Sequence, residues 1–311
     1  MDSETFVGTV RSILGNVVYA GLGEGADARE VACRVRGRLK LERSENRTLV
    51  AVGDRVRVRV GADGAGIVEE VLERRTLLAR KWVMNAERLD PVVANADLLC
   101  IVVSVNPVVK PGIVDRYLVA GIAGGLSPVI VLNKIDLPEA SRQCVKLDVY
   151  RSLGYRVIET SAKSGVGLDA LESEIIGKTA AFCGHSGVGK SSILNRIFDF
   201  GLKVGDVAGK TLKGRHTTTH VKMLANPAGG WVIDTPGIRS FGVAGVHSED
   251  LIQLFPELYP LTHKCEFRDC THAAGQKGCA IAEAVARGEV TASRLESWAK
   301  LRDELAAAEV W

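Results

Sequence analysis

The segment Gly184-His-Ser-Gly-Val-Gly-Lys-Ser191 restricts the fold of this chain more than any other feature. It follows an apolar run at residues 179–183 and precedes a stretch of helical character. Glycines at this spacing let successive backbone N–H groups turn inward, and the following helix adds the positive end of its dipole. The pattern therefore predicts a strand, a phosphate-binding loop (P-loop) and a helix. A glycine-rich turn without a ligand is the alternative, and the complete motif in this context argues against it.

The P-loop predicts a role for each of its polar residues. Lys190 should reach the β- and γ-phosphates of a nucleotide, and Ser191 should ligate Mg²⁺. We therefore expect Lys190 to take part in catalysis as well as binding. The residues expected around the phosphates are Gly184, His185, Ser186, Gly187, Val188, Gly189, Lys190, Ser191 and Ser192.

Two further segments indicate which base is bound. Asn133-Lys-Ile-Asp136 follows an apolar strand, and Thr160-Ser-Ala-Lys163 lies one strand later. A carboxylate at Asp136 accepts hydrogen bonds from the ring N–H and the amine of guanine, a donor pair that adenine lacks. The combination predicts GTP and GDP as substrate and product. The residues expected around the base are Asn133, Lys134, Ile135, Asp136, Ser161, Ala162 and Lys163.

Metal and γ-phosphate contacts are expected after the P-loop. Asp234, at the end of an apolar strand, should hold Mg²⁺ through water, and Gly237 leaves space for its N–H near the γ-phosphate. In the loop Gly214-Arg-His-Thr-Thr-Thr219, Thr218 is the threonine expected to complete the Mg²⁺ shell, whereas Thr219 is also compatible with the start of a strand.

Hydrolysis needs a residue that orients water, and the sequence offers an unusual one. Ile238 stands where conventional GTPases have a water-orienting glutamine. The nearest polar substitute is His216, just before the threonines, and we expect it to be catalytic. A histidine that only contacts RNA or solvent is the alternative.

The motifs occur in a circularly permuted order. Conventional small GTPases have the P-loop first, whereas here both base-reading segments precede it. Buried apolar runs at 98–104, 128–132, 156–158, 179–183 and 231–234 alternate with helical segments, which predicts a doubly wound α/β sheet. Such a sheet is compatible with chain ends at different places.

The flanking segments differ in character from this core. Alternating strands up to about residue 75 predict a small closed β-barrel. Same-face basic residues on two of them favour an RNA-backbone surface over a merely solvated face. These are Arg34, Arg36, Arg38, Lys40, Arg55, Arg57 and Arg59.

The last segment, helical at both ends, carries a Cys/His-rich loop. Cys265, Cys270, His272 and Cys279 provide the ligand types and number of a structural Zn²⁺ site. Free thiols on a loop are the alternative. The remaining cysteines, Cys33, Cys100, Cys144 and Cys183, lie in apolar segments and are expected to fill the core.

The permuted order, the threonine loop, the barrel and the Cys/His cluster together resemble the RsgA (YjeQ) family of bacterial GTPases, which assist late maturation of the small ribosomal subunit. The resemblance implies an OB-fold at 1–75, a permuted GTPase domain at 80–245 and a mostly helical zinc-binding domain at 246–311. It also implies one zinc ion per chain and binding to the small subunit and its rRNA. Relative to the family pattern this chain has one more residue before Cys279, which leaves His263 as an alternative ligand.

Composition fits this interpretation. The net charge of +3 is too small to indicate nucleic-acid binding alone, and no apolar run is long enough to span a membrane. We expect a cytoplasmic monomer. Two alternatives remain: a permuted GTPase that serves the large subunit, and an RNA-binding scaffold with negligible turnover.

Overall fold

The computed structural model describes most of the chain. The described residues are 4–23, 25, 28–37, 50–82, 85–202, 221–235 and 245–309, with the backbone alone given for 80–89. Several expected site residues lie outside these ranges: Arg38, Lys40, His216, Thr217, Thr218, Thr219, Gly237 and Ile238.

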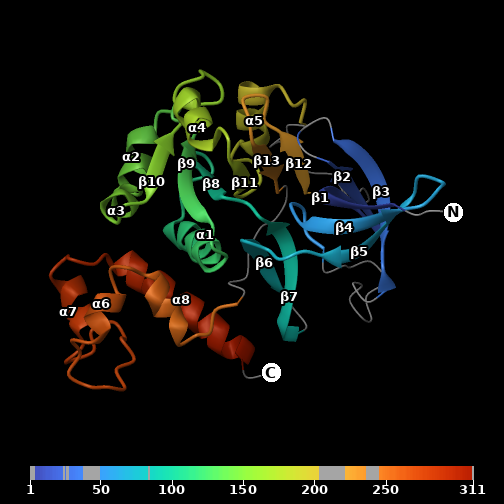
Figure 1. Ribbon diagram of the computed structural model, residues 1–311. Coiled ribbons are helices and arrows are strands. Elements are labelled where there is room, and N and C mark those ends of the chain that lie inside the picture. Colours follow the sequence, from blue (N-terminus) through green and yellow to red (C-terminus); the bar gives the residue numbers. More distant parts are fainter. Residues whose placement is uncertain are drawn as a thin grey trace, which may run out of the picture.

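Five strands near the N-terminus close into a barrel, which confirms the predicted OB-fold (Figure 1). They are β1 (Glu4–Leu14), β2 (Val17–Leu22), β3 (Arg29–Val35), β4 (Arg55–Val60) and β5 (Gly66–Val71). Strands β1, β2 and β3 pair antiparallel in sequence, β3 is parallel to β5, and β4 joins β5 to β1. Alternate valines of β4 point into the core while its arginines are exposed, as the period-two pattern requires.

The central domain is a six-stranded sheet in the order β10-β9-β8-β11-β13-β12. All its strands are parallel except β12, which runs antiparallel to β13. The strands are β8 (Leu98–Ser104), β9 (Ser127–Asn133), β10 (Arg156–Glu159), β11 (Thr179–Cys183), β12 (Lys222–Ala225) and β13 (Trp231–Asp234). The P-loop and both base-reading segments follow the carboxyl ends of β11, β9 and β10, so they share one edge of the sheet.

Helices cover both faces of this sheet, which confirms the doubly wound fold. The helices are α1 (Pro111–Ala123), α2 (Ala140–Val145), α3 (Asp148–Ser152), α4 (Leu168–Ile175) and α5 (Lys190–Phe198). Leu99 and Ile101 of β8 pack in the cluster that contains α1 residues. Cys100 and Val102, which point the other way, pack in the cluster that contains α4 and α5 residues.

A hairpin and one strand pairing connect the barrel to the core. The hairpin of β6 (Leu77–Trp82) and β7 (Asn85–Ala94) spans the expected boundary near residues 75–80. Its many charged residues conceal the strand alternation, which is why the sequence did not reveal it. In addition, β1 pairs with β12 at Ser12 and Lys222, so barrel and core form one continuous sheet.

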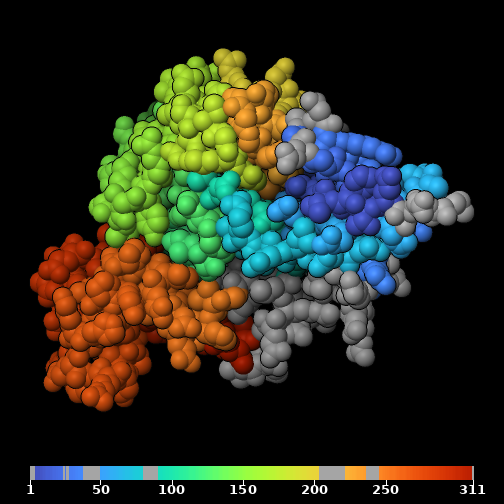
Figure 2. Space-filling view, in the orientation of Figure 1, coloured from blue at the N-terminus to red at the C-terminus, as the bar shows by residue number. Residues whose placement is uncertain are grey.

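The C-terminal module is mostly helical, as predicted. It contains a 3-10 helix η2 (Asp250–Leu254), α6 (Tyr259–Thr262), α7 (Ala280–Ala286) and α8 (Ala292–Glu309) around its own apolar cluster. Figure 2 shows this orange and red body beside the green residues of the core, where α8 packs against α1. None of the helices within the described ranges has both the length and the apolar character needed to cross a bilayer.

Candidate nucleotide-binding site and metal cluster

The P-loop is held in a conformation that requires glycine at two positions. Gly184 has φ +140°, and a Cβ there would lie 2.2 Å from the carbonyl oxygen of Val102. Gly189 has φ +95°, and a Cβ there would lie 2.3 Å from Nδ2 of Asn133. Because both positions combine a backbone conformation that L side chains avoid with a close neighbour, the loop packs directly against β8 and the base-reading segment.

Lys190 and Asp234 place opposite charges at the end of the sheet. Lys190 is 7% exposed, and its Nζ donates to the carbonyl oxygens of Gly184 at 2.6 Å and His185 at 3.3 Å. Burial lowers the pKa of Lys190, and the charge of Asp234 opposes that shift. Burial likewise raises the pKa of Asp234, whose Oδ1 has no hydrogen-bond partner among the described residues. An unpartnered buried carboxylate oxygen beside a P-loop has the chemistry of a ligand to a hydrated cation.

Asn133 connects the P-loop to the second base-reading segment. Its Nδ2 donates to the carbonyl oxygen of Val188 at 2.9 Å, and its Oδ1 accepts from the backbone N–H of Ala162 at 3.1 Å. Lys134 adds a second connection, because its Nζ donates to the carbonyl oxygen of Gly187 at 2.6 Å. Three segments that are far apart in the sequence are thereby fixed relative to one another.

Asp136 is exposed at the rim of this arrangement. Ser161 Oγ donates to its Oδ1 at 2.6 Å, and this hydrogen bond lowers the pKa of the Asp136 carboxyl. The backbone N–H of Ser164 donates to the Ser161 hydroxyl at 3.1 Å and so orients it. The result is an ionised carboxylate at a fixed place, suited to accept two parallel hydrogen bonds from a base.

One contact at this site was not anticipated. The Lys134 ammonium also donates to the carbonyl oxygen of Asn106 at 2.6 Å, in the loop after β8. A loop that follows a buried parallel strand at the ligand-binding edge is the sequence signal that could have drawn attention to it.

The Cys/His loop forms a compact cluster. The ligand atoms of Cys265, Cys270, His272 and Cys279 all lie within 4.8 Å of one another. His272 Nδ1 is 3.5 Å from Cys265 Sγ and 3.6 Å from Cys279 Sγ. Tetrahedral zinc with Zn–S near 2.3 Å and Zn–N near 2.0–2.1 Å would place nitrogen and sulfur about 3.5–3.6 Å apart. The donor set and its spacing therefore fit zinc, with Cys279 in the cluster and His263 outside it, against the ring of Tyr259.

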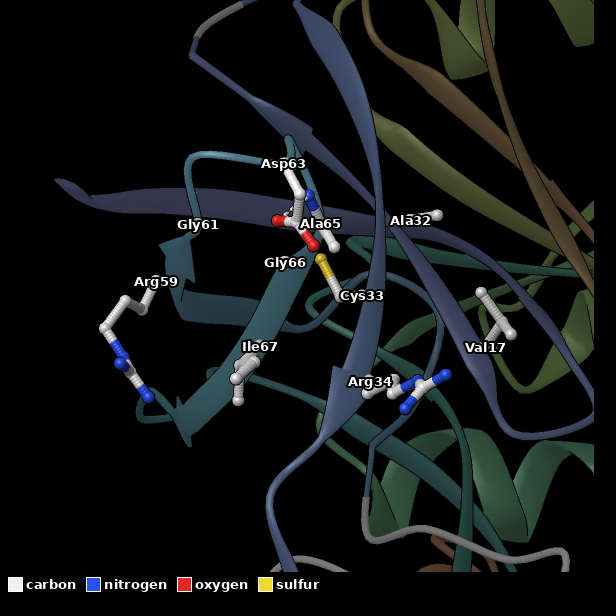
Figure 3. Close-up of a pocket in the computed structure, with 10 residues that line it drawn as sticks. All are labelled: Val17, Ala32, Cys33, Arg34, Arg59, Gly61, Asp63, Ala65, Gly66 and Ile67. Atoms are coloured by element: carbon white, nitrogen blue, oxygen red, sulfur yellow. Dashed lines mark hydrogen bonds between the residues drawn. The ribbon is translucent and has the colours of Figure 1, made fainter. Parts of the chain in front are cut away.

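Some arginines on the basic face of the barrel are already paired with carboxylates, which the sequence does not indicate. On β4, Arg57 pairs with Glu70 and Arg59 with Glu69, each at 2.9 Å. Arg34 and Arg36, exposed at β3 and just beyond it, have no carboxylate partner among the described residues. Figure 3 shows Ile67 of β5 between Arg34 and Arg59 at a cavity of about 490 Å³. Arg55, exposed at the start of β4, also has no carboxylate partner among the described residues, so two of the three unpaired arginines of this face lie on the β3 side.

The fold and this site together define a GTPase with a circularly permuted core. Residues 71–244 match the family model described as RsgA GTPase. The chain therefore belongs to the RsgA GTPase family, and it is a GTP hydrolase.

One curated relative and two solved structures are similar to this chain over nearly its whole length. A relative from Chlorobaculum tepidum, named small ribosomal subunit biogenesis GTPase RsgA, is 38% identical over 97% of this chain and 99% of its own length. The crystal structure of YjeQ from Thermotoga maritima matches with a TM-score of 0.69 and 32% identity, covering 97% of this chain and 99% of that one. The structure of YloQ, described as a circularly permuted GTPase, matches with a TM-score of 0.65 and 28% identity over 98% and 96% of the two chains.

Proposed function

We propose that this protein binds the small ribosomal subunit and its rRNA and assists late maturation of the subunit, with GTP hydrolysis stimulated by the subunit. The observation that carries the proposal is a permuted GTPase core between a basic barrel and a Cys/His module, in a chain that is 38% identical over 97% of its length to a relative named small ribosomal subunit biogenesis GTPase RsgA. The protein acts in this proposal as a cytoplasmic monomer, with domains at 1–75, 80–245 and 246–311.

The roles of the site residues follow from their positions. Asp136, held by Ser161, reads guanine, and the P-loop N–H groups with Lys190 bind the phosphates. Ser191 and Thr218 would hold Mg²⁺, with Asp234 contacting it through water, and the ion would neutralise charge on the β- and γ-phosphates. Cys265, Cys270, His272 and Cys279 would hold one zinc ion per chain, whose contribution is structural.

His216 is the proposed water-orienting residue. Since Ile238 has no polar group, the attacking water has to be held in line by another group, either His216 or one on the ribosome. We expect slow hydrolysis by the protein alone and faster hydrolysis when the small subunit brings His216 to the water. His216→Ala should keep near-normal GTP affinity and lose the stimulated rate. A variant that is stimulated as strongly as the parent would place the catalytic group elsewhere.

The experiment that tests the proposal compares separated ribosomal subunits. Co-sedimentation with GTP, a non-hydrolysable analogue and GDP should show binding to the small subunit that depends on the nucleotide. Phosphate release should rise with small subunits and stay at the basal rate with large subunits. Preference for the large subunit would contradict the proposal, and binding without stimulated release would favour the scaffold alternative.

The barrel offers a matched pair of variants for the RNA contact. Replacing Arg34 and Arg36 by glutamine should weaken binding to the small subunit and flatten its dependence on salt, because fewer phosphates are neutralised. Replacing Arg57 and Arg59 in the same way should have a smaller effect, since both already pair with glutamates. Equal effects of the two variants would show that charge in general, rather than the β3 side, attracts the RNA.

A further inference from the structure

A buried ionic network joins the C-terminal module to the GTPase core. Arg294 of α8 is 2% exposed and donates from Nη1 to Oδ1 of Asp115 on α1 at 2.5 Å. It also donates from Nε and Nη2 to the two carboxylate oxygens of Glu257, at 2.5 and 3.2 Å. Tyr150 of α3 donates to the same Asp115 oxygen at 2.7 Å, and the Phe255 ring lies 4.5 Å from the guanidinium carbon. One arginine thus connects two elements of the core with the segment between η2 and α6.

The rest of this interface provides little apolar attachment. The apolar cluster of the module consists of residues beyond 245, and Val119 is the residue of α1 that enters it among those described. Arg116 and Glu304 form a second ion pair at 2.6 Å, but Glu304 is 56% exposed, so the pair contributes little. Domains of one chain are expected to move relative to each other unless a large hydrophobic interface fixes them, and the buried contact described here is ionic.

An ionic contact suits an interface that opens. Buried ion pairs add little stability compared with apolar residues of similar volume, whereas their fixed geometry specifies one arrangement. When such a contact separates, water solvates the charges, which an exposed apolar face does not permit at similar cost. Glu257, in the same module, holds the guanidinium through two of its nitrogens and leaves Nη1 directed at Asp115, so the contact with α1 forms at one defined position.

Each end of α8 contacts a segment that continues along the chain toward the nucleotide site. Helix α1 begins directly after Lys110, which lines a cavity of about 290 Å³ together with His185 and Ser186 of the P-loop. At the other end of α8, the Glu309 carboxylate accepts from the backbone N–H of Ser248 at 2.8 Å and from its hydroxyl at 2.6 Å. Ser248 lies on the chain that enters the module after Asp234.

We propose that Arg294 is a latch that docks the C-terminal module on α1, and that docking and nucleotide state are coupled through this contact. The bound nucleotide changes the fraction of molecules in which the module is docked, and by reciprocity the docked state changes the relative affinities for GDP and GTP. Ribosome binding is not required for this coupling, so it is testable on the isolated protein.

The test uses two variants and one control. Arg294→Lys keeps a positive charge but loses the fork that spans both carboxylates. Asp115→Ala breaks the latch from the core side and leaves the Arg294–Glu257 contact within the module intact. Burial raises the pKa of Asp115, and asparagine resembles the protonated form of that carboxyl and could still accept the hydrogen bond from Arg294. Alanine is chosen because it removes the acceptor. Arg116→Ala, at the exposed pair of the same interface, is the control.

Hydrogen exchange of the α8 amides, with GDP and with a non-hydrolysable GTP analogue, gives the first readout. In the parent and the control, exchange should differ at least about fivefold between the two nucleotides, the lower end of usual allosteric coupling. Both latch variants should lose that difference, and their ratio of GDP to analogue affinity should change by the same factor. Zinc content equal to that of the parent shows that the module of each variant is folded.

Two results would overturn the latch. One is α8 exchange in the parent that is the same with either nucleotide. The other is an affinity ratio in Asp115→Ala that equals that of the parent. If Arg294→Lys loses its zinc, Asp115→Ala alone decides, since it changes no residue of the module.

Discussion

At the scale of single residues, base selection depends on how Asp136 is held. Its carboxylate is exposed, so burial does not fix it, and the hydrogen bond from Ser161 supplies the orientation. That bond also keeps the pKa of Asp136 below its ordinary value, so the group is ionised throughout the neutral range. An ionised, oriented acceptor is what the two donors on guanine require.

Asp136→Asn should therefore weaken GTP binding and shift preference toward xanthosine triphosphate. The new amide donates where guanine also donates, and a mismatched polar contact costs about 1–3 kcal/mol, or roughly 5- to 150-fold in affinity. Titration of the variant with both nucleotides checks the prediction. Ser161→Ala is the control: it loosens the carboxylate and should lower affinity without changing the preferred base. Unchanged GTP affinity in Asp136→Asn would show that this residue does not read the base.

The residues that the sequence could identify are those in short contiguous motifs. Glycines, a lysine and an asparagine at fixed spacing each have a local reason to be there, so the P-loop and Asn133-Lys-Ile-Asp136 were readable. The latch was not, because Asp115 and Arg294 are 179 positions apart. Charged residues in helical stretches usually face solvent, and nothing in the sequence distinguishes these two from the rest.

At the scale of elements, the Cys/His loop is also held in place by a helix cap and by packing on α8, in addition to the four predicted zinc ligands. Cys279 caps α7, since its sulfur accepts from the backbone N–H of Ala282 at 3.4 Å. The His272 ring meets the edge of Trp298 on α8 at 5.8 Å between centroids, and the guanidinium of Arg302 lies over the same indole. The spacing of the cysteines predicted the cluster, whereas its packing on α8 depends on residues about 30 positions later.

We predict that Cys270→Ser lowers zinc content from one ion per chain and unfolds the C-terminal module while nucleotide binding is retained. Three ligands hold zinc less tightly than four, and the module derives part of its folding free energy from the metal. Elemental analysis and hydrogen exchange of the α7 and α8 amides report on the module, and GDP affinity reports on the core. Cys144→Ser, at a half-buried thiol outside the cluster, is the control. Absence of zinc from the parent, purified without chelator, would contradict the metal site.

At the scale of the whole molecule, the barrel is joined to β12, the neighbour of the strand that ends in Asp234. The guanidinium of Arg11, on β1, lies 5.0 Å from the Trp231 ring at the start of β13, and the same side chain donates to the carbonyl oxygen of Gly25 at 2.7 Å. Together with the pairing of Ser12 and Lys222, this contact makes the barrel continuous with the sheet that carries the nucleotide site. The patterns of apolar residues along the chain predicted both domains, but an antiparallel pairing between them could not be foreseen, because neither strand carries a signal for its partner.

Nucleotide binding should consequently protect the barrel as well as the core. GDP at 100 times its dissociation constant stabilises the form that binds it by about 2.7 kcal/mol, which corresponds to roughly 100-fold slower exchange of amides that open only by global unfolding. If barrel and core unfold as one unit, amides of β1 and β2 show most of this slowing. Arg11→Ala removes the contact with Trp231 and should reduce the slowing in the barrel while leaving it in β11 and β13. Arg55→Ala, at an exposed arginine on β4, should leave both unchanged. Barrel amides that exchange at the same rate with and without GDP in the parent would show that the two domains unfold independently despite their shared sheet.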